Sequence, residues 1–242
     1  MRFRTISSDP ASGQFDTVIT LPRQVKSTPT RRRYDATRRQ AAALETRRAI
    51  ATAARELFLE RGYTATTMAA IASAARVSHE TVYATLGPKP AVFRHLIETA
   101  LSGADEPIPP LEREYARQVL SEQDPGRVID IYARAMRLTQ ERLASLFDVL
   151  NHAATTAPEL AAYLKELIER RALYTRMIAD HLAEIGSLRE DVPVQTAADV
   201  LFALNSSEFF LLLARDRDWP PDHFERWLAD AWKRLLLPAP RR

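Results

Sequence analysis

The stretch that decides the fold is Thr67-Met-Ala-Ala-Ile-Ala-Ser-Ala-Ala-Arg-Val-Ser-His-Glu-Thr-Val-Tyr83. Its length and pattern predict two short helices joined by a tight turn. Thr67 and Ser78 are good N-cap residues, because their hydroxyls accept hydrogen bonds from free backbone N–H groups. We expect the first helix to run to about Ala75 and the second to about Leu86.

The two predicted helices have distinct apolar and polar faces. Ala72 and Ala75 are small enough to let the helices cross closely. The residues expected to be buried are Met68, Ile71, Val77, Val82 and Leu86. The side chains left outside on the second helix are Ser78, His79, Glu80, Thr81 and Tyr83. Such short polar groups, with one phenol, suit a helix inserted into the major groove of DNA. A helical hairpin inside an ordinary bundle has the same periodicity, and this stretch alone is compatible with both.

Two further helices flank this stretch. The preceding one carries apolar residues at helical spacing, namely Ile50, Ala53, Ala54, Leu57 and Phe58. Gly62 is expected to end it, because glycine adopts positive φ without strain. After Gly87-Pro88-Lys89-Pro90, a fourth helix is expected with Pro90 in its first turn and its end near Ser102-Gly103.

These helices resemble the first four helices of the TetR family of bacterial regulators, over residues 44–100. The resemblance lies in the run Thr46-Arg-Arg-Ala-Ile-Ala-Thr-Ala-Ala-Arg-Glu-Leu-Phe-Leu-Glu-Arg-Gly-Tyr63, then Thr66-Thr67, Ile71-Ala72, Val77-Ser78, Thr81-Val82-Tyr83 and Lys89. It implies an all-α fold with an N-terminal three-helix helix-turn-helix DNA-binding domain. It also implies a helical C-terminal domain for ligand binding and dimerisation.

The resemblance implies a role for individual residues. Thr67 would meet a phosphate at a helix N-terminus, where the dipole and free N–H groups favour an anion. The residues expected at base edges or nearby phosphates are Ser78, His79, Glu80 and Thr81. Tyr83 would donate its hydroxyl to the DNA backbone, and Lys89 would pair with a phosphate on the other flank.

The chain departs from the family pattern in three places. Arg76 occupies a turn position where the family usually has glycine, and a non-glycine residue in the left-handed region costs roughly 1 kcal/mol. Its cation is a further candidate for a phosphate contact. Thr85-Leu86 replaces the common His-Phe pair, which removes one backbone contact. Glu80 is acidic, so it either accepts from a cytosine amino group or points away from DNA.

Charge is distributed unevenly along the 242 residues. The net charge is +3, yet residues 1–100 carry 16 Lys+Arg against 8 Asp+Glu, and residues 101–242 carry 18 against 23. A basic first part indicates contact with a polyanion.

Composition excludes several classes of site. The chain has no cysteine, which excludes disulfides, Cys-bound zinc and a thiol nucleophile. Its longest apolar run, residues 209–214, is far short of the roughly 18 residues that span a bilayer, and the basic N-terminus has no signal-peptide pattern. We therefore expect a cytoplasmic protein without membrane contact.

We expect three regions along the chain: a disordered basic tail at 1–36, a helix-turn-helix DNA-binding domain at 38–88, and a ligand-binding and dimerisation domain at 89–242. The tail is interpreted as a mobile extension, as the product of an upstream start codon, or as a basic arm that contacts DNA. In the last region, breaks at proline and glycine predict helices near 111–122, 125–140, 141–155, 158–186, 194–216 and 221–237.

The last two predicted helices carry many apolar side chains. Two such helices from each subunit would form the four-helix interface of a homodimer, although their aromatic residues also suit an internal core. Ligand-pocket candidates are Phe147, Leu150, His152, Leu167, Tyr174, Met177, Phe202 and Asn205. His152 and Asn205 would be the polar groups of a mostly apolar site, although an apolar stripe at helical spacing is more often part of a core than of a cavity.

The sequence contains no recognisable catalytic or cofactor motif. A Glu-x-x-His pair, a P-loop and Gly-rich nucleotide-binding patterns are all missing, so we expect no catalytic residues, no metal and no cofactor. The predicted function is a DNA-binding transcriptional regulator, a ligand-responsive repressor that binds a palindromic operator as a dimer and takes a small-molecule effector. The alternative is a helical binding or catalytic protein whose N-terminal module is only a scaffold.

Overall fold

The computed structural model describes the backbone of residues 30–239 and the side chains of residues 38–239. The described part of the chain is entirely helical, with ten α-helices and one short 3-10 helix, and it contains no strand. This confirms the predicted all-α class. Residues 42–239 belong to one compact unit, and residues 30–41 at the start of α1 fall outside it. The helices are α1 (Thr30–Ala65), α2 (Met68–Ala74), α3 (His79–Leu86), α4 (Lys89–Ser102), η1 (Pro110–Glu112), α5 (Glu114–Ser121), α6 (Pro125–Ala154), α7 (Pro158–Glu184), α8 (Val194–Leu204), α9 (Ser207–Ala214) and α10 (Pro221–Leu236).

The first helix begins earlier than the sequence predicts. Helix α1 starts at Thr30, so the expectation of an unstructured tail is wrong for residues 30–36. Residues 36–48 are rich in Ala and Arg and contain no glycine or proline, so a helix already packed further along the chain extends easily toward its N-terminus. The rest of the predicted tail, residues 1–29, lies outside the described residues.

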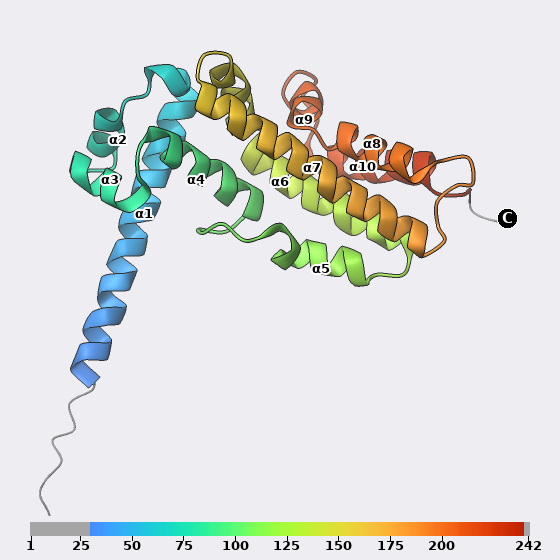
Figure 1. Ribbon diagram of the computed structural model, residues 1–242, viewed down its shortest axis with the longest axis horizontal. Coiled ribbons are helices and arrows are strands. Elements are labelled where there is room, and N and C mark those ends of the chain that lie inside the picture. The colour runs from blue at the N-terminus through green and yellow to red at the C-terminus, as the bar shows by residue number, and fades with distance from the viewer. Residues whose placement is uncertain (1–29, 240–242) are drawn as a thin grey trace, which may run out of the picture. The chain divides into compact units, whose positions relative to one another are not determined.

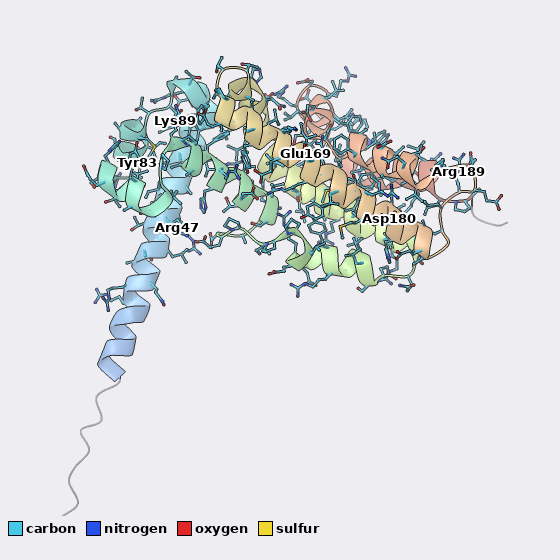
Figure 2. The ribbon with its side chains drawn as sticks, viewed as in Figure 1. Arg47, Tyr83, Lys89, Glu169, Asp180 and Arg189 are labelled. Carbon is cyan, nitrogen blue, oxygen red and sulfur yellow. The ribbon has the colours of Figure 1, made fainter. Side chains whose placement is uncertain are left out.

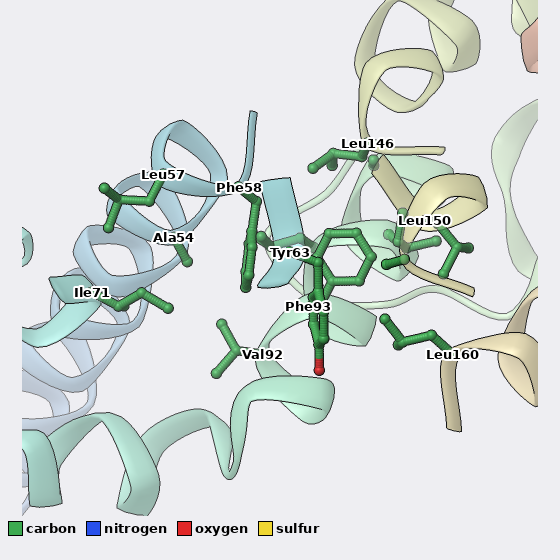
Figure 3. Packing of buried hydrophobic residues seen from close by; sticks show 14 of the residues in the cluster. Ala54, Leu57, Phe58, Tyr63, Ile71, Val92, Phe93, Leu146, Leu150 and Leu160 are labelled. Carbon is green, nitrogen blue, oxygen red and sulfur yellow. The ribbon is translucent and has the colours of Figure 1, made fainter. Parts of the chain in front are cut away.

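Aromatic side chains hold helices α1 and α4 together in the first of two hydrophobic clusters (Figure 3). Phe58 and Phe93 are fully buried and meet edge to face with ring centroids 4.9 Å apart. Tyr63 stacks on Phe58 at 5.6 Å and meets Phe93 at 5.4 Å. Leu146 and Leu150 of α6 complete this cluster. The packing therefore joins the helix-turn-helix region to the long central helices.

The long helices α6 and α7 form the centre of the remaining chain (Figure 1). Helix α5 packs on both of them, α8 packs on α7, and α9 and α10 pack on α6. Trp232 is fully buried in the second hydrophobic cluster, where its ring stacks on Tyr132 at 5.1 Å.

Two predicted helix boundaries in this region are wrong. The helices expected at 125–140 and 141–155 are the single helix α6, because no glycine or proline interrupts residues 127–154. The helix expected at 194–216 is two helices, α8 and α9, bent by 49°. Ser206 starts the second of these by accepting a hydrogen bond from the backbone N–H of Phe209, and such local capping competes with continuation of a helix.

No described helix alone is long and apolar enough to cross a membrane, and only the bent pair α8 and α9 has the necessary length and composition when both are counted together.

Candidate DNA-binding surface and interior cavity

Helix α3 starts at a side-chain cap, as predicted. The Ser78 hydroxyl accepts a hydrogen bond from the backbone N–H of Thr81 at 3.1 Å and lies 3.1 Å from the Thr81 hydroxyl. Thr81 is half-buried. Its carbonyl accepts a hydrogen bond from the Thr85 hydroxyl at 2.7 Å, within the same helix. Ser78 and Thr81 therefore fix where α3 begins before they contact any partner.

The face of α3 opposite its core side is polar and open. Val82 is fully buried, whereas His79, Glu80 and Tyr83 are exposed. The rings of His79 and Tyr83 touch, with centroids 4.9 Å apart. Tyr83, which Figure 2 labels on α3, keeps 46% of its surface exposed. The side chains predicted to read DNA are therefore exposed together on one face of α3.

Glu80 lies at the N-terminus of α3 and is tied to its own helix. Hydrogen bonds from its own backbone N–H and from the Ser78 hydroxyl lower the pKa of the Glu80 carboxyl. A carboxylate at a helix N-terminus is also stabilised by the helix dipole. Glu80 therefore remains ionised. Its carboxylate occupies part of the N-terminal end of α3, where the free backbone N–H groups would otherwise bind an external anion.

Thr67 caps helix α2 as predicted. Its side-chain oxygen accepts a hydrogen bond from the backbone N–H of Ala70 at 3.1 Å, and the residue is exposed. The hydroxyl proton remains available to an external acceptor. The neighbouring Thr66 has the opposite role: it is fully buried and donates to the carbonyls of Gly62 (2.8 Å) and Leu57 (3.0 Å).

Arg76 adopts the left-handed conformation that the sequence predicts for the turn between α2 and α3. Its φ is 56°, and its side chain is exposed. A non-glycine residue with this backbone is strained, because its Cβ approaches the following carbonyl oxygen. The turn therefore keeps a cation at a place where glycine would be more stable.

Replacing Arg76 with glycine is expected to raise the free energy of unfolding by about 1 kcal/mol, because the strain disappears. Urea denaturation, monitored by circular dichroism, measures this free energy. The opposite control is Gly62→Ala. Gly62 has φ 76° and ψ 174°, a conformation essentially limited to glycine, and no atom lies within 4 Å of the point that an alanine Cβ would occupy, so backbone strain alone should lower stability by about 1–3 kcal/mol. A loss of stability in Arg76→Gly would contradict the strain argument.

Lys89 binds its own chain at the start of α4. Its ammonium donates to the carbonyl of Thr66 at 2.8 Å and of Thr64 at 3.3 Å, and it lies 4.3 Å from the centre of the Tyr63 ring (Figure 2). Burial lowers the pKa of Lys89. The residue thus joins α4 to the segment between α1 and α2, and a contact with phosphate would use the one remaining N–H.

A cavity of ≈ 90 Å³ lies between α4, α6 and α7 and the start of α9. Its wall is largely apolar but includes a buried polar network. Gln140 donates to the carbonyl of Asn205 at 2.8 Å, Asn205 donates to the Tyr132 hydroxyl at 3.0 Å, and Ser207 donates to Gln140 at 2.8 Å. The lining residues are Ile97, Leu101, Pro110, Arg113, Tyr115, Tyr132, Met136, Thr139, Gln140, Leu143, Phe147, Leu167, Ile168, Arg170, Arg171, Tyr174, Asn205 and Ser207.

Four of the predicted pocket residues line this cavity: Phe147, Leu167, Tyr174 and Asn205. The other four predicted pocket residues do not line the cavity. In a helix, a side chain one or two positions away points to a different face, so periodicity alone easily selects the wrong residue. Leu150 is buried in the first cluster, Met177 lies in a separate small pocket beside α5, and Phe202 lies beneath the Arg171 guanidinium. His152 is exposed near the end of α6 and bonds to the Asp148 carbonyl at 2.7 Å, so it supplies no polar group to the cavity.

An ion pair that sequence analysis missed joins α4 to α7 beside the cavity. Glu98 accepts two hydrogen bonds from the Arg170 guanidinium, at 2.9 and 3.1 Å, and one from the Tyr163 hydroxyl at 2.8 Å. Burial and Glu98 together raise the pKa of Tyr163, so its hydroxyl keeps the proton that it donates. Because the partners are 65 and 72 residues apart, no local pattern could have signalled them.

Comparison with known proteins shows which proteins these features resemble. The profile of the bacterial regulatory proteins of the tetR family matches residues 50–95, which span the helix-turn-helix region. The HTH-type transcriptional repressor BepR of Brucella suis is 29% identical over 175 residues, which cover 69% of this chain and 80% of BepR.

Solved structures share the fold over most of the chain. NalD, the secondary repressor of the MexAB-OprM multidrug efflux pump in Pseudomonas aeruginosa, is 26% identical, with a TM-score of 0.58 over 79% of this chain and 96% of NalD. The SmeT–triclosan complex is 19% identical, with a TM-score of 0.64 over 81% of this chain and 93% of SmeT. With the exposed polar face of α3 and the capped α2–α3 pair, these matches show that the chain is similar, over its helix-turn-helix region, to the bacterial regulatory proteins of the tetR family, a family of DNA-binding transcriptional regulators.

Proposed function

We propose that this regulator is a ligand-responsive repressor that binds a palindromic operator as a homodimer. One observation carries the proposal: α4 begins next to the exposed reading helix, and its other end, at Ile97 and Leu101, lines the interior cavity. A ligand in the cavity would thereby act on the helix that connects to α3. Such a ligand would change DNA binding only if its affinity differed between the conformation that binds the operator and the conformation that does not.

The proposed DNA contacts fall into two classes. Exposed α3 side chains, led by His79, would read base edges, while hydroxyls and cations would bind phosphate and set the register. The proposed set is Thr67, Arg76, Ser78, His79, Glu80, Thr81, Tyr83 and Lys89. Five of these also form hydrogen bonds within the chain, so their contacts with DNA would be added to a structural role: Thr67, Ser78, Glu80, Thr81 and Lys89.

Relatives support the repressor and effector parts of the proposal. BepR and NalD are both repressors. SmeT has been solved with triclosan, and a transcriptional regulator from Saccharomonospora viridis with choline, so proteins of this fold accept small molecules.

The proposed dimer interface uses the helices after residue 194. Leu212 of α9 is 52% exposed and Leu235 of α10 is 45% exposed, which leaves apolar surface for a second copy. We further propose that residues 38–88 form the DNA-binding domain and residues 89–242 the ligand-binding and dimerisation domain. The protein would act in the cytoplasm, where DNA is accessible.

Selection from random double-stranded DNA with the full chain, followed by footprinting at stated salt, tests the proposal. The expected result is an inverted repeat whose half-sites lie about one helical turn apart, roughly 10 base pairs. Light scattering of the complex is expected to give two chains for each operator or a multiple of two. Enrichment of no sequence over competitor DNA would reject the DNA-reading role.

Replacing Tyr83 with phenylalanine is expected to weaken DNA binding about 10-fold, because one hydrogen bond to a charged phosphate is lost while the ring contact with His79 remains. Fluorescence anisotropy with operator and with random DNA measures both affinities. The two should fall alike, since phosphate contacts carry no sequence information. A loss confined to one base position would contradict this role.

A further inference from the structure

The charged side chains that line the cavity are all positive. Three arginines line it, Arg113, Arg170 and Arg171, and no aspartate or glutamate does. Arg170 is neutralised by Glu98. Neither Arg113 nor Arg171 forms an ion pair with any residue in the described part of the chain. Two positive charges therefore border a largely apolar space without a carboxylate of the protein to balance them.

Arg171 is the more exceptional of the two. Its guanidinium lies 4.0 Å from the centre of the Phe202 ring, and its Nε is buried without a hydrogen-bond partner. Burial lowers the pKa of this side chain. Glu208 favours the charged form of Arg171 electrostatically but forms no ion pair with it. Its carboxylate accepts a hydrogen bond from Asn151 at 3.1 Å instead. Arg171 is only half-buried, but a cation with a buried, unused donor is costly unless an anion meets it.

Neutral donors lie beside this cation. The Tyr132 hydroxyl accepts a hydrogen bond from Asn205, which leaves its own proton free to be donated. Burial raises the pKa of Tyr132, so that proton stays in place at neutral pH. Arg113 uses its Nε on the carbonyl of Ile108 at 3.2 Å and has its terminal nitrogens left over. All of these donors suit an acceptor that carries negative charge.

The remaining wall limits the size and polarity of the occupant. Met136, Leu143 and Phe147 are buried and apolar, and the volume of ≈ 90 Å³ is small. We propose that the cavity binds a small organic carboxylate with an apolar body, its carboxylate held by Arg171 and the Tyr132 hydroxyl. This inference rests on the proposed ligand-responsive function and names the class of its effector.

Calorimetry on the full chain tests the inference with acetate, benzoate and phenylacetate, each compared with its neutral amide. At least one carboxylate is expected to bind, and to bind at least 10-fold more tightly than its amide, because a charge-assisted pair with Arg171 is lost in the amide. Equal affinity for acid and amide, or binding by none of the three carboxylates, would overturn the inference.

Variants on one helix locate the contact. Arg171→Met is expected to bind the carboxylate at least 10-fold more weakly, while Arg171→Lys keeps the preference for acid over amide because it keeps the charge. Arg176→Met is the matched control, since Arg176 is exposed on the same helix and pairs with Asp180 at 2.9 Å. Unchanged affinity in Arg171→Met would overturn the inference. Operator binding by the ligand-free full chain is measured in parallel: its absence rejects the proposed function, whereas loss of carboxylate selectivity alone rejects only the effector class.

Discussion

Phe58→Ala is expected to lower the free energy of unfolding by about 3–5 kcal/mol, the usual cost of removing a buried phenyl ring. Phe58 is fully buried and contacts two other aromatic rings, Tyr63 and Phe93, so the neighbours cannot fill the space without giving up their own contacts. A domain typically has only about 5–15 kcal/mol of net stability. Urea denaturation should therefore show a large decrease in the midpoint.

The adjacent residue provides the control. Leu59 is 40% exposed in the same helix, so Leu59→Ala should change stability by less than about 1 kcal/mol. Affinity for DNA should follow stability in this pair, because the Phe58 cluster also buries Ile71 and Val82 of the reading module. Similar destabilisation by both substitutions would contradict the view that the aromatic cluster supports α2 and α3.

The helix-turn-helix region was predictable because short-range chemistry determines it. The caps at Thr67 and Ser78, the positive φ of Gly62 and the left-handed Arg76 are each decided within a few residues. Each was predicted from the sequence and is confirmed. The division between α8 and α9 is also decided locally, by the Ser206 cap. It was missed because this cap lies in the middle of a continuous apolar pattern that predicts one long helix.

The cavity was less predictable because it depends on contacts between distant segments. Four residues proposed from the sequence line the cavity, namely Phe147, Leu167, Tyr174 and Asn205, but periodicity could not tell which face of a long helix meets a cavity. His152 was chosen as a polar residue near apolar ones, yet it lies on the surface. Arg171 was overlooked because arginine normally lies in solvent, so only its unpaired, buried Nε identifies it.

Glu98→Ala is expected to destabilise the protein by about 3 kcal/mol, at the low end of the range for a broken buried ion pair. The substitution leaves the Tyr163 hydroxyl without its acceptor and deprives Arg170 of a bidentate partner, while the 29% exposure of Arg170 and its longer contact with Glu166 at 3.6 Å limit the loss. Thermal and urea denaturation of the full chain measure the effect.

Glu166→Ala is the matched control for this prediction. Glu166 also pairs with Arg170 and reaches Arg94 at 3.1 Å, but its side chain is 43% exposed, and exposed pairs contribute at most about 1 kcal/mol. The double variant Glu98→Ala with Arg170→Met should cost less than the sum of the two single variants, because it leaves no orphaned cation. A loss from Glu98→Ala no larger than from Glu166→Ala would mean that this pair does not bind α4 to α7. If the larger loss is found, the contact of Glu98 with Arg170 and Tyr163 is what holds α4 against α7 beside the cavity.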